Sequence, residues 1–160
     1  MSGDVRSFDQ KRNVATRIHI VAGFIHREIC ETMVEAARDL SDELNVNIEP
    51  VTWVPGSLEA PLAVKELIET DRPDAIVVFG VQEQGKTKHG EVIAYEVTSK
   101  LLDLQLNNRM PMAIAIIGPC ATLEHARGKA KYTAQKAIRA AVSMVSLLQK
   151  IGRGDKNSNE

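Results

Sequence analysis

The sequence lacks the features on which several classes of protein depend. Only 2 of its 160 residues are cysteines, and only 4% are aromatic. Cys30 and Cys120 show no CxxC spacing and no disulfide framework, a pattern typical of a reducing compartment. We therefore expect a cytoplasmic protein that folds without structural disulfides.

The sequence also has no large excess of positive or negative residues and no long apolar run. The 20 Lys+Arg and 21 Asp+Glu give a formal charge of -1, so nucleic-acid binding has no electrostatic driving force. No apolar run approaches the ~20 residues that cross a bilayer, and the first residues lack the apolar core of a signal peptide. We therefore expect no nucleic-acid partner and no membrane association.

What the chain does contain is a regular alternation of short apolar runs and longer segments of helical period. This alternation predicts an α/β fold, a three-layer sandwich of flavodoxin-like type whose four-stranded parallel sheet has helices on both faces. We expect one domain over residues 17–151, with a flexible arm at 1–16 and a flexible tail at 152–160. The predicted strands are 17–22, 47–54, 75–80 and 112–117, and the predicted helices are 28–44, 58–69, 89–107 and 122–150.

One predicted loop spells a phosphate-binding motif. Residues 80–87 read GVQEQGKT, which matches G-x-x-x-x-G-K-[ST] between a strand and a helix and by itself indicates a nucleoside triphosphatase. The motif follows the third strand, however, and the strand 112–117 ends without an aspartate that could help to hold magnesium. We therefore interpret the loop as a site for one phosphate group, bound by backbone N–H groups, Lys86 and Thr87.

His89 and a Pro-Gly turn provide further candidate groups. His89 directly follows the phosphate loop, and an imidazole with a pKa near ~6.5 is well matched to proton transfer. Its alternative role is that of a solvated histidine at a helix start. In the turn at 55–61, Ser57 is a candidate N-cap and Glu59 falls in the first helical turn. Those two residues either begin the helix or bind a polyhydroxylated or amide-rich ligand.

Two of these loops match one known family at the right separation. Residues 54–61 read VPGSLEAP and resemble its VPGAFEIP, while Gly80 with 85–89 resembles its G-x-x-x-x-G-E-T-x-H. Residues 136–141, KAIRAA, also fall in the expected place. Over about residues 17–150 the chain thus resembles the 6,7-dimethyl-8-ribityllumazine synthases of riboflavin biosynthesis.

This resemblance implies a transferase that condenses 5-amino-6-ribitylaminouracil with 3,4-dihydroxy-2-butanone 4-phosphate and releases phosphate and water, without cofactor or metal. It implies that residues 57–59 hold the ribityl chain and pyrimidine, that 85–87 hold the phosphate, and that His89 transfers protons. The substrate-binding residues that it implies are Phe24, Ile25, His26, Ser57, Leu58, Glu59, Val81, Gln82, Glu83, Gly85, Lys86, Thr87, Ile114, Arg127 and Lys129.

The chain departs from the family pattern at the expected ring contacts. In the first loop the family has an aromatic residue followed by Asn; the same register here reads Ile25-His26, with Phe24 one position early. A strand position often occupied by Phe reads Ile114. These departures motivate an alternative function, that of a non-catalytic relative that binds a lumazine or flavin-like ring. A triphosphate-binding protein is the third hypothesis.

Two further features of the family leave alternatives: which residue takes the place of its phosphate-binding Arg, and how many subunits assemble. Counting from Glu124, Lys129 takes the position of that Arg, and Arg127 lies two residues away. The resemblance also implies a homopentamer in which residues 114–129 reach the neighbouring subunit's pocket. Because residues 129–136 contain no glycine to kink the last helix, we expect a pentamer or a pair of pentamers.

Overall fold

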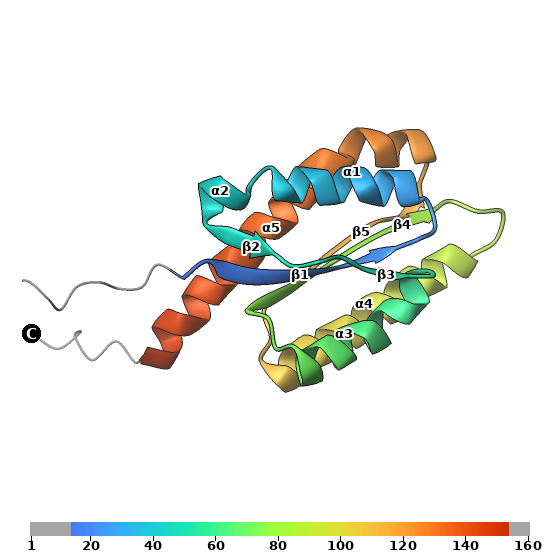
Figure 1. Ribbon diagram of the computed structural model, residues 1–160. Helices are drawn as coiled ribbons and strands as arrows, with labels where there is room; N and C mark the ends of the chain where they lie inside the picture. The colour runs from blue at the N-terminus through green and yellow to red at the C-terminus, as the bar shows by residue number, and fades with distance from the viewer. Residues whose placement is uncertain (1–13, 154–160) are drawn as a thin grey trace, which may run out of the picture.

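A computed structural model describes residues 14–153 and contains a parallel sheet between two layers of helices (Figure 1). The strand order is β2-β1-β4-β5, and β3 also pairs with β1. All of these pairs are parallel, so the predicted α/β class is confirmed. In chain order the elements are β1 (Thr16–Gly23), α1 (Arg27–Arg38), α2 (Ser41–Leu44), β2 (Val46–Ile48), β3 (Thr52–Val54), η1 (Ser57–Glu59), α3 (Ala60–Thr70), β4 (Ala75–Glu83), α4 (His89–Asn108), β5 (Met112–Ala121) and α5 (Leu123–Arg153).

The sheet has five strands, one more than predicted, because the predicted strand 47–54 is interrupted. Pro50 lies between β2 and β3 and has no N–H group to donate to a neighbouring strand. The two short strands pair with different parts of β1, at Thr16–Ile18 and at Val21–Gly23. The predicted helix 28–44 is likewise divided into α1 and α2.

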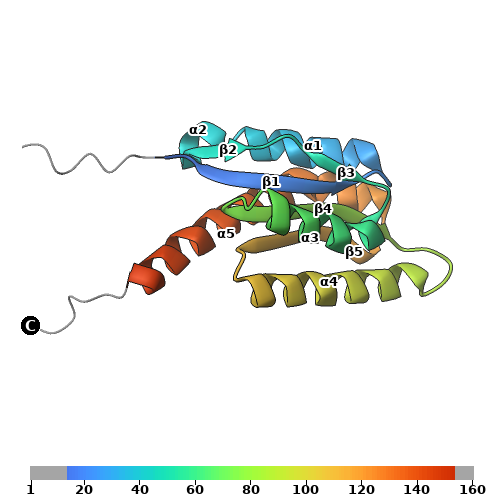
Figure 2. The ribbon, with the colours of Figure 1, turned by 60° about the horizontal axis from the view of Figure 1, so that its bottom comes forward.

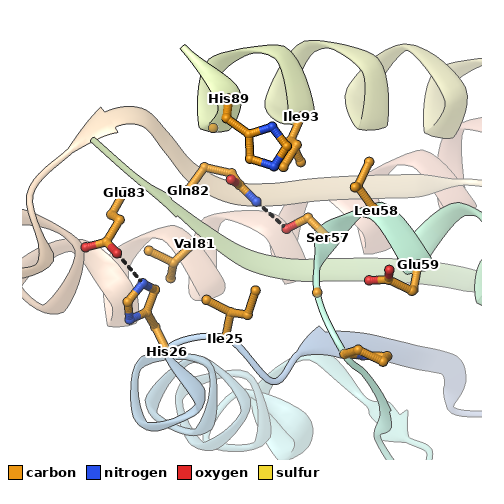
Figure 3. Close-up of a pocket in the computed structure, with 13 residues that line it drawn as sticks. Ile25, His26, Ser57, Leu58, Glu59, Val81, Gln82, Glu83, His89 and Ile93 are labelled. Carbon is orange, nitrogen blue, oxygen red and sulfur yellow. Dashed lines mark hydrogen bonds and ion pairs between the residues drawn. The ribbon is translucent and has the colours of Figure 1, made fainter. Parts of the chain in front are cut away.

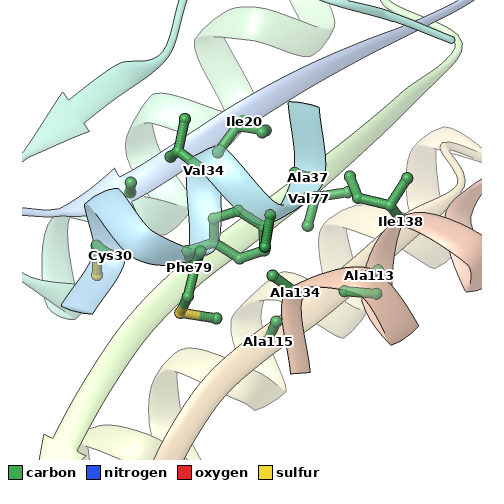
Figure 4. Close-up of a cluster of buried hydrophobic side chains, with 14 of the residues drawn as sticks. Ile20, Cys30, Val34, Ala37, Val77, Phe79, Ala113, Ala115, Ala134 and Ile138 are labelled. Atoms are coloured by element: carbon green, nitrogen blue, oxygen red, sulfur yellow. The ribbon is translucent and has the colours of Figure 1, made fainter. Parts of the chain in front are cut away.

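The core is built on both faces of β4. Val77 and Phe79 point towards α1 and α5, whereas Ile76 and Val78 point towards α3 and α4. Figure 4 shows Phe79 close to Ala134 of α5, and Ala126 and Ala130 of the same helix belong to this cluster. Such small residues allow a helix to lie close to the sheet, so Phe79 is only 1% exposed.

The last helix extends well beyond the sheet. Figure 2 shows the carboxyl-terminal half of α5 projecting away from the layers that its first half covers. The helix ends at Arg153 and β1 begins at Thr16. Most of the predicted arm and tail, residues 1–13 and 154–160, lies outside the described residues. Within residues 14–153, no helix has the length and apolar character needed to span a membrane.

Candidate functional site

The candidate site is an open cleft of about 420 Å³ at the carboxyl ends of the strands (Figure 3). Segments that follow β1 and β3 form its walls together with the end of β4 and the start of α4. Ligands bind at this edge of parallel α/β sheets because several loops converge there. The lining residues are Ile25, His26, Pro55, Gly56, Ser57, Leu58, Glu59, Val81, Gln82, Glu83, His89, Gly90 and Ile93.

The turn between β1 and α1 directs neighbouring side chains to opposite sides. His26 has a left-handed conformation, with φ 56°, and its carbonyl accepts a hydrogen bond from the Ile29 N–H at 3.0 Å. Its side chain lines the cleft, where Nε2 lies 3.3 Å from Oε1 of Glu83 (Figure 3). Phe24 instead packs outside the cleft, with its ring 5.6 Å from that of Trp53. Ile25 therefore forms the apolar wall of this turn.

The Arg27 guanidinium explains why Phe24 turns outward. Its Cζ lies 4.6 Å from the centre of the Phe24 ring and 5.0 Å from that of Trp53. A cation over two aromatic faces is an attractive arrangement. Arg27 also forms an ion pair with Glu31 one turn later in α1. The cluster of Phe24, Trp53 and Arg27 is thus stabilised by its own contacts.

The predicted N-cap role of Ser57 is wrong. Ser57 begins the short helix η1, and the residue that precedes α3 is Glu59, which makes no side-chain cap. The Ser57 hydroxyl instead accepts a hydrogen bond from Nε2 of Gln82 at 2.9 Å. Ser57 is 8% exposed, whereas the neighbouring Leu58 and Glu59 are exposed at the cleft. The serine side chain therefore links the η1 turn after β3 to β4 instead of capping a helix.

The phosphate motif has an unusual backbone path. Strand β4 continues through Glu83 and pairs with β5 at Gly80, Val81 and Glu83. The first half of the motif is therefore extended strand and does not curl around an anion as a nucleoside triphosphate site requires. Only residues 84–88 form a loop before α4. This geometry favours a site for a single phosphate group over the triphosphate hypothesis.

A second cleft of about 260 Å³ surrounds that loop. Lys86 and Lys88 line it and are exposed, so two positive charges face a space next to the larger cleft. Glu83 and Gly90 line both clefts, which places the two spaces side by side. His89 lines the larger one and begins α4. A ligand with a ring and a phosphate group, or two ligands that react, fits this arrangement.

Besides Phe24, three predicted substrate contacts lie outside both clefts of the described chain. Ile114 lies on β5 and packs partly buried against the core under α3 and α4. Arg127 lies on α5, where it is 3.4 Å from Glu28, and the Lys129 ammonium lies 5.9 Å from the Tyr132 ring centre. Neither cleft is lined by these three side chains.

Neither cysteine belongs to a metal site among the described residues. Cys30 is buried in the core, and burial raises the pKa of its thiol to about 11. Cys120 is exposed at the smaller cleft. Within residues 14–153 no three His, Cys, Asp or Glu side chains come together in a group that could hold a metal ion.

Four lining residues escaped the sequence prediction. Pro55 and Gly56 form the turn that carries Ser57, and a Cβ at Gly56 would lie 3.2 Å from Ile25 Cδ1. Gly90 and Ile93 lie in the first turns of α4. The Pro-Gly pair and the helical spacing of Ile93 from His89 were the available signals, because residues four apart share a helix face.

Comparison with known proteins gives one consistent result. A family model for 6,7-dimethyl-8-ribityllumazine synthase matches residues 15–149. The protein of that name from Saccharolobus islandicus (strain L.S.2.15) is 35% identical over 135 residues, which cover 84% of this chain and 88% of the relative. Those from Metallosphaera sedula and Methanopyrus kandleri are 34% and 36% identical, over 89% and 84% of this chain and 95% of each relative.

Proposed function

The chain belongs to the 6,7-dimethyl-8-ribityllumazine synthase family, a family of transferases in riboflavin biosynthesis, and from this premise we propose its substrates and site. It condenses 5-amino-6-ribitylaminouracil with 3,4-dihydroxy-2-butanone 4-phosphate to the lumazine, with release of phosphate and water. The observation that carries the proposal is the pair of adjoining clefts that share Glu83 and Gly90. Their sizes and linings suit a ring beside a phosphate group.

The larger cleft binds the ribitylaminopyrimidine. The apolar side chains of Ile25, Val81 and Ile93 provide walls for the faces of the ring. The carboxylate of Glu59 and the backbone of Ser57 and Leu58 provide hydrogen-bonding groups for the ribityl hydroxyls. Leu58 and Glu59 are exposed to the cleft and therefore accessible to a ligand.

The smaller cleft binds the phosphate of the second substrate. Lys86 and Lys88 supply positive charge, and the loop backbone at Gly85 and Thr87 supplies N–H groups next to the start of α4. Binding the two substrates side by side brings the amine of one to the ketone of the other. Such positioning replaces an improbable encounter by a local reaction.

The chemistry then needs proton transfers more than any added cofactor. The pyrimidine amine attacks the ketone and water leaves, which forms a Schiff base. Loss of the proton from the hydroxyl-bearing carbon expels phosphate and leaves an enol, which takes up a proton to become a methyl ketone. The ribityl-bearing nitrogen attacks that carbonyl and closes the ring with loss of a second water. His89 lines the larger cleft at the start of α4, where an imidazole can exchange these protons.

Residues 114–129 act in the pocket of a neighbouring subunit within a homopentamer or a pair of pentamers. Arg127 and Lys129 are exposed on α5 and lie outside the clefts of their own chain, so another copy is the geometry in which they reach phosphate. Light scattering on the purified protein tests the assembly. A mass of one subunit would contradict it.

The outward position of Phe24 favours a second candidate function, a relative that binds the ring without turnover. Within residues 14–153 no Phe, Tyr or Trp side chain lines the larger cleft, so the aromatic stacking partner of the family pattern is missing there. Mixing the purified protein with both substrates and following lumazine absorbance above the uncatalysed rate separates the two functions. Catalysed formation of the lumazine supports the synthase, whereas lumazine binding without formation supports the relative.

A further inference from the structure

The side chains of Gln82 and Ser57 form a hydrogen-bonded pair in the middle of the larger cleft. This pair has no part in the proposed phosphate binding or proton transfer. Nε2 of Gln82 donates to Oγ of Ser57 at 2.9 Å, and both residues line the cleft. Figure 3 draws the Gln82 amide between His89 and Ser57. Ser57 is buried and Gln82 is partly buried, and the bond between them restricts both side chains, so they present fixed polar atoms among apolar walls.

Gly80 leaves the space that this pair needs. A Cβ at Gly80 would lie 3.0 Å from the Ser57 Oγ, a distance that would force the hydroxyl to move. A Cβ at Gly90 would lie 3.6 Å from Oε1 of Gln82 and 3.2 Å from the carbonyl oxygen of Glu83. The bare backbone at Gly80 therefore leaves room for the hydroxyl, whereas a Cβ at Gly90 would be tight against the Glu83 carbonyl and only in ordinary contact with the amide oxygen.

The bond leaves one donor and one acceptor unused. Ser57 accepts the amide N–H, so its own hydroxyl proton remains available for donation. Oε1 of Gln82 accepts no hydrogen bond from any donor within residues 14–153. A donor beside an acceptor is complementary to a planar edge that carries a carbonyl next to an N–H group.

We propose that Gln82, oriented by Ser57, determines specificity for the imide edge of a pyrimidinedione ring. Oε1 of Gln82 accepts the ring N–H, and the Ser57 hydroxyl donates to the adjacent carbonyl. This inference rests on the proposed function, whose pyrimidine substrate and lumazine product both carry that edge. It assigns recognition of the ring to polar side chains at a cleft whose lining, within the described residues, includes no Phe, Tyr or Trp.

Binding of two probes tests the proposal directly. The probes are 6,7-dimethyl-8-ribityllumazine and its analogue methylated at the imide nitrogen, each titrated by its fluorescence. The wild-type protein should bind the first at least about 10-fold more tightly, because a site built to bond an N–H rejects a ligand without it. Gln82→Leu should bind both with nearly equal, weaker affinity. Retained discrimination in Gln82→Leu would overturn the proposal.

Kinetics and matched variants complete the test. Gln82→Leu should raise KM for the pyrimidine about 10-fold and leave KM for the sugar phosphate within about 2-fold. Gln149→Leu makes the same substitution on an exposed part of α5 and should change neither KM. The single variant Ser57→Ala should discriminate between the probes less than the wild type does. The double variant with Ser57→Ala and Gln82→Leu should discriminate no less than Gln82→Leu alone, since the serine acts partly by orienting the amide. An equal rise of both KM values in Gln82→Leu would count against the proposal.

Failure of the inference and failure of the proposed function give different results. A wild-type protein that binds the lumazine with imide discrimination but never forms it refutes the synthase and supports the role of Gln82. A wild-type protein that forms the lumazine, with Gln82→Leu unchanged in both probes, refutes the role of Gln82 alone. A wild-type protein that neither forms nor binds the lumazine refutes both.

Discussion

Polar side chains bond one another at the amino end of β1, whereas at the carboxyl ends of the strands several are left without partners. Arg17 Nε lies 2.9 Å from Glu49 Oε1, and its NH2 lies 2.9 Å from Asp71 Oδ1. His19 Nε2 forms a hydrogen bond of 2.9 Å with Thr52 Oγ1. Charged and polar groups here bind β1 to its neighbours.

The edge of the sheet at the carboxyl ends of the strands contains similar residue types, but several of their side chains have no partner in the described part of the chain. The side chains of Glu59, Lys86, Lys88 and His89 make no hydrogen bond or ion pair with any residue in the described part of the chain. Polar groups that serve the fold are usually paired within it, while groups that serve a ligand must remain available. This difference is consistent with the proposed role of His89 in proton transfer and with a structural role for His19.

The largest expected effect that tests the contrast between His19 and His89 is on turnover. His89→Ala should slow lumazine formation roughly 10- to 1000-fold, because a positioned proton-transfer group is lost. Its thermal unfolding should stay close to wild type, since the imidazole has no partner among the described residues. Steady-state kinetics and calorimetry on the same preparations measure both quantities. Unchanged turnover would remove His89 from the mechanism.

The next effect concerns the cations of α5. Lys129→Ala and Arg127→Ala should each be tested for a selective rise in KM for the sugar phosphate. We expect about 10- to 100-fold in the variant that removes the phosphate contact, because bonds to charged groups contribute about 1.5–3 kcal/mol. Lys150→Ala, exposed near the end of α5, is the control. Indifference in both variants would show that neither side chain binds phosphate.

The free energy of unfolding tests the structural role of His19 on β1. His19 is 9% exposed, so His19→Ala removes a buried bond to Thr52 and should lower the free energy of unfolding by about 1–3 kcal/mol. Turnover per folded subunit should stay the same. His125→Ala, an exposed residue on α5, should change stability little. A loss of turnover in His19→Ala without a loss of stability would contradict the assignment.

The smallest effect is a pH dependence. The Arg17 guanidinium that bonds Asp71, together with His19, holds the pKa of that carboxyl below its usual value. A lowered folded pKa means that the stabilisation is present above the unfolded pKa, near ~3.9, and is lost as pH falls through the folded pKa. Asp71→Asn should therefore flatten the fall in melting temperature between about pH 5 and pH 3. Asp39→Asn is the exposed control, and an equal flattening there would refute the assignment.

Local sequence patterns were sufficient to predict the structure where the residue types themselves determine the backbone conformation. The strand 75–80 could be predicted from its apolar run, and the glycines and prolines of the two site loops marked where chain direction changes. The prediction of one strand over 47–54 missed the interruption at Pro50, because the apolar residues on either side favour a continuous strand. The direction of Phe24 could not be predicted, because it depends on Trp53 and Arg27, which only the fold brings together.

The sequence alone determined the α/β alternation, the family resemblance and the identity of the two loops, since these follow from periodicity and from short motifs. Only the tertiary structure placed Ser57 against Gln82, joined the two clefts at Glu83, and separated His19 from His89 as groups with and without partners. The physical reason is that hydrogen bonds and burial join residues that are distant in the chain. Their partners are fixed by strand register and helix packing and not by local preference.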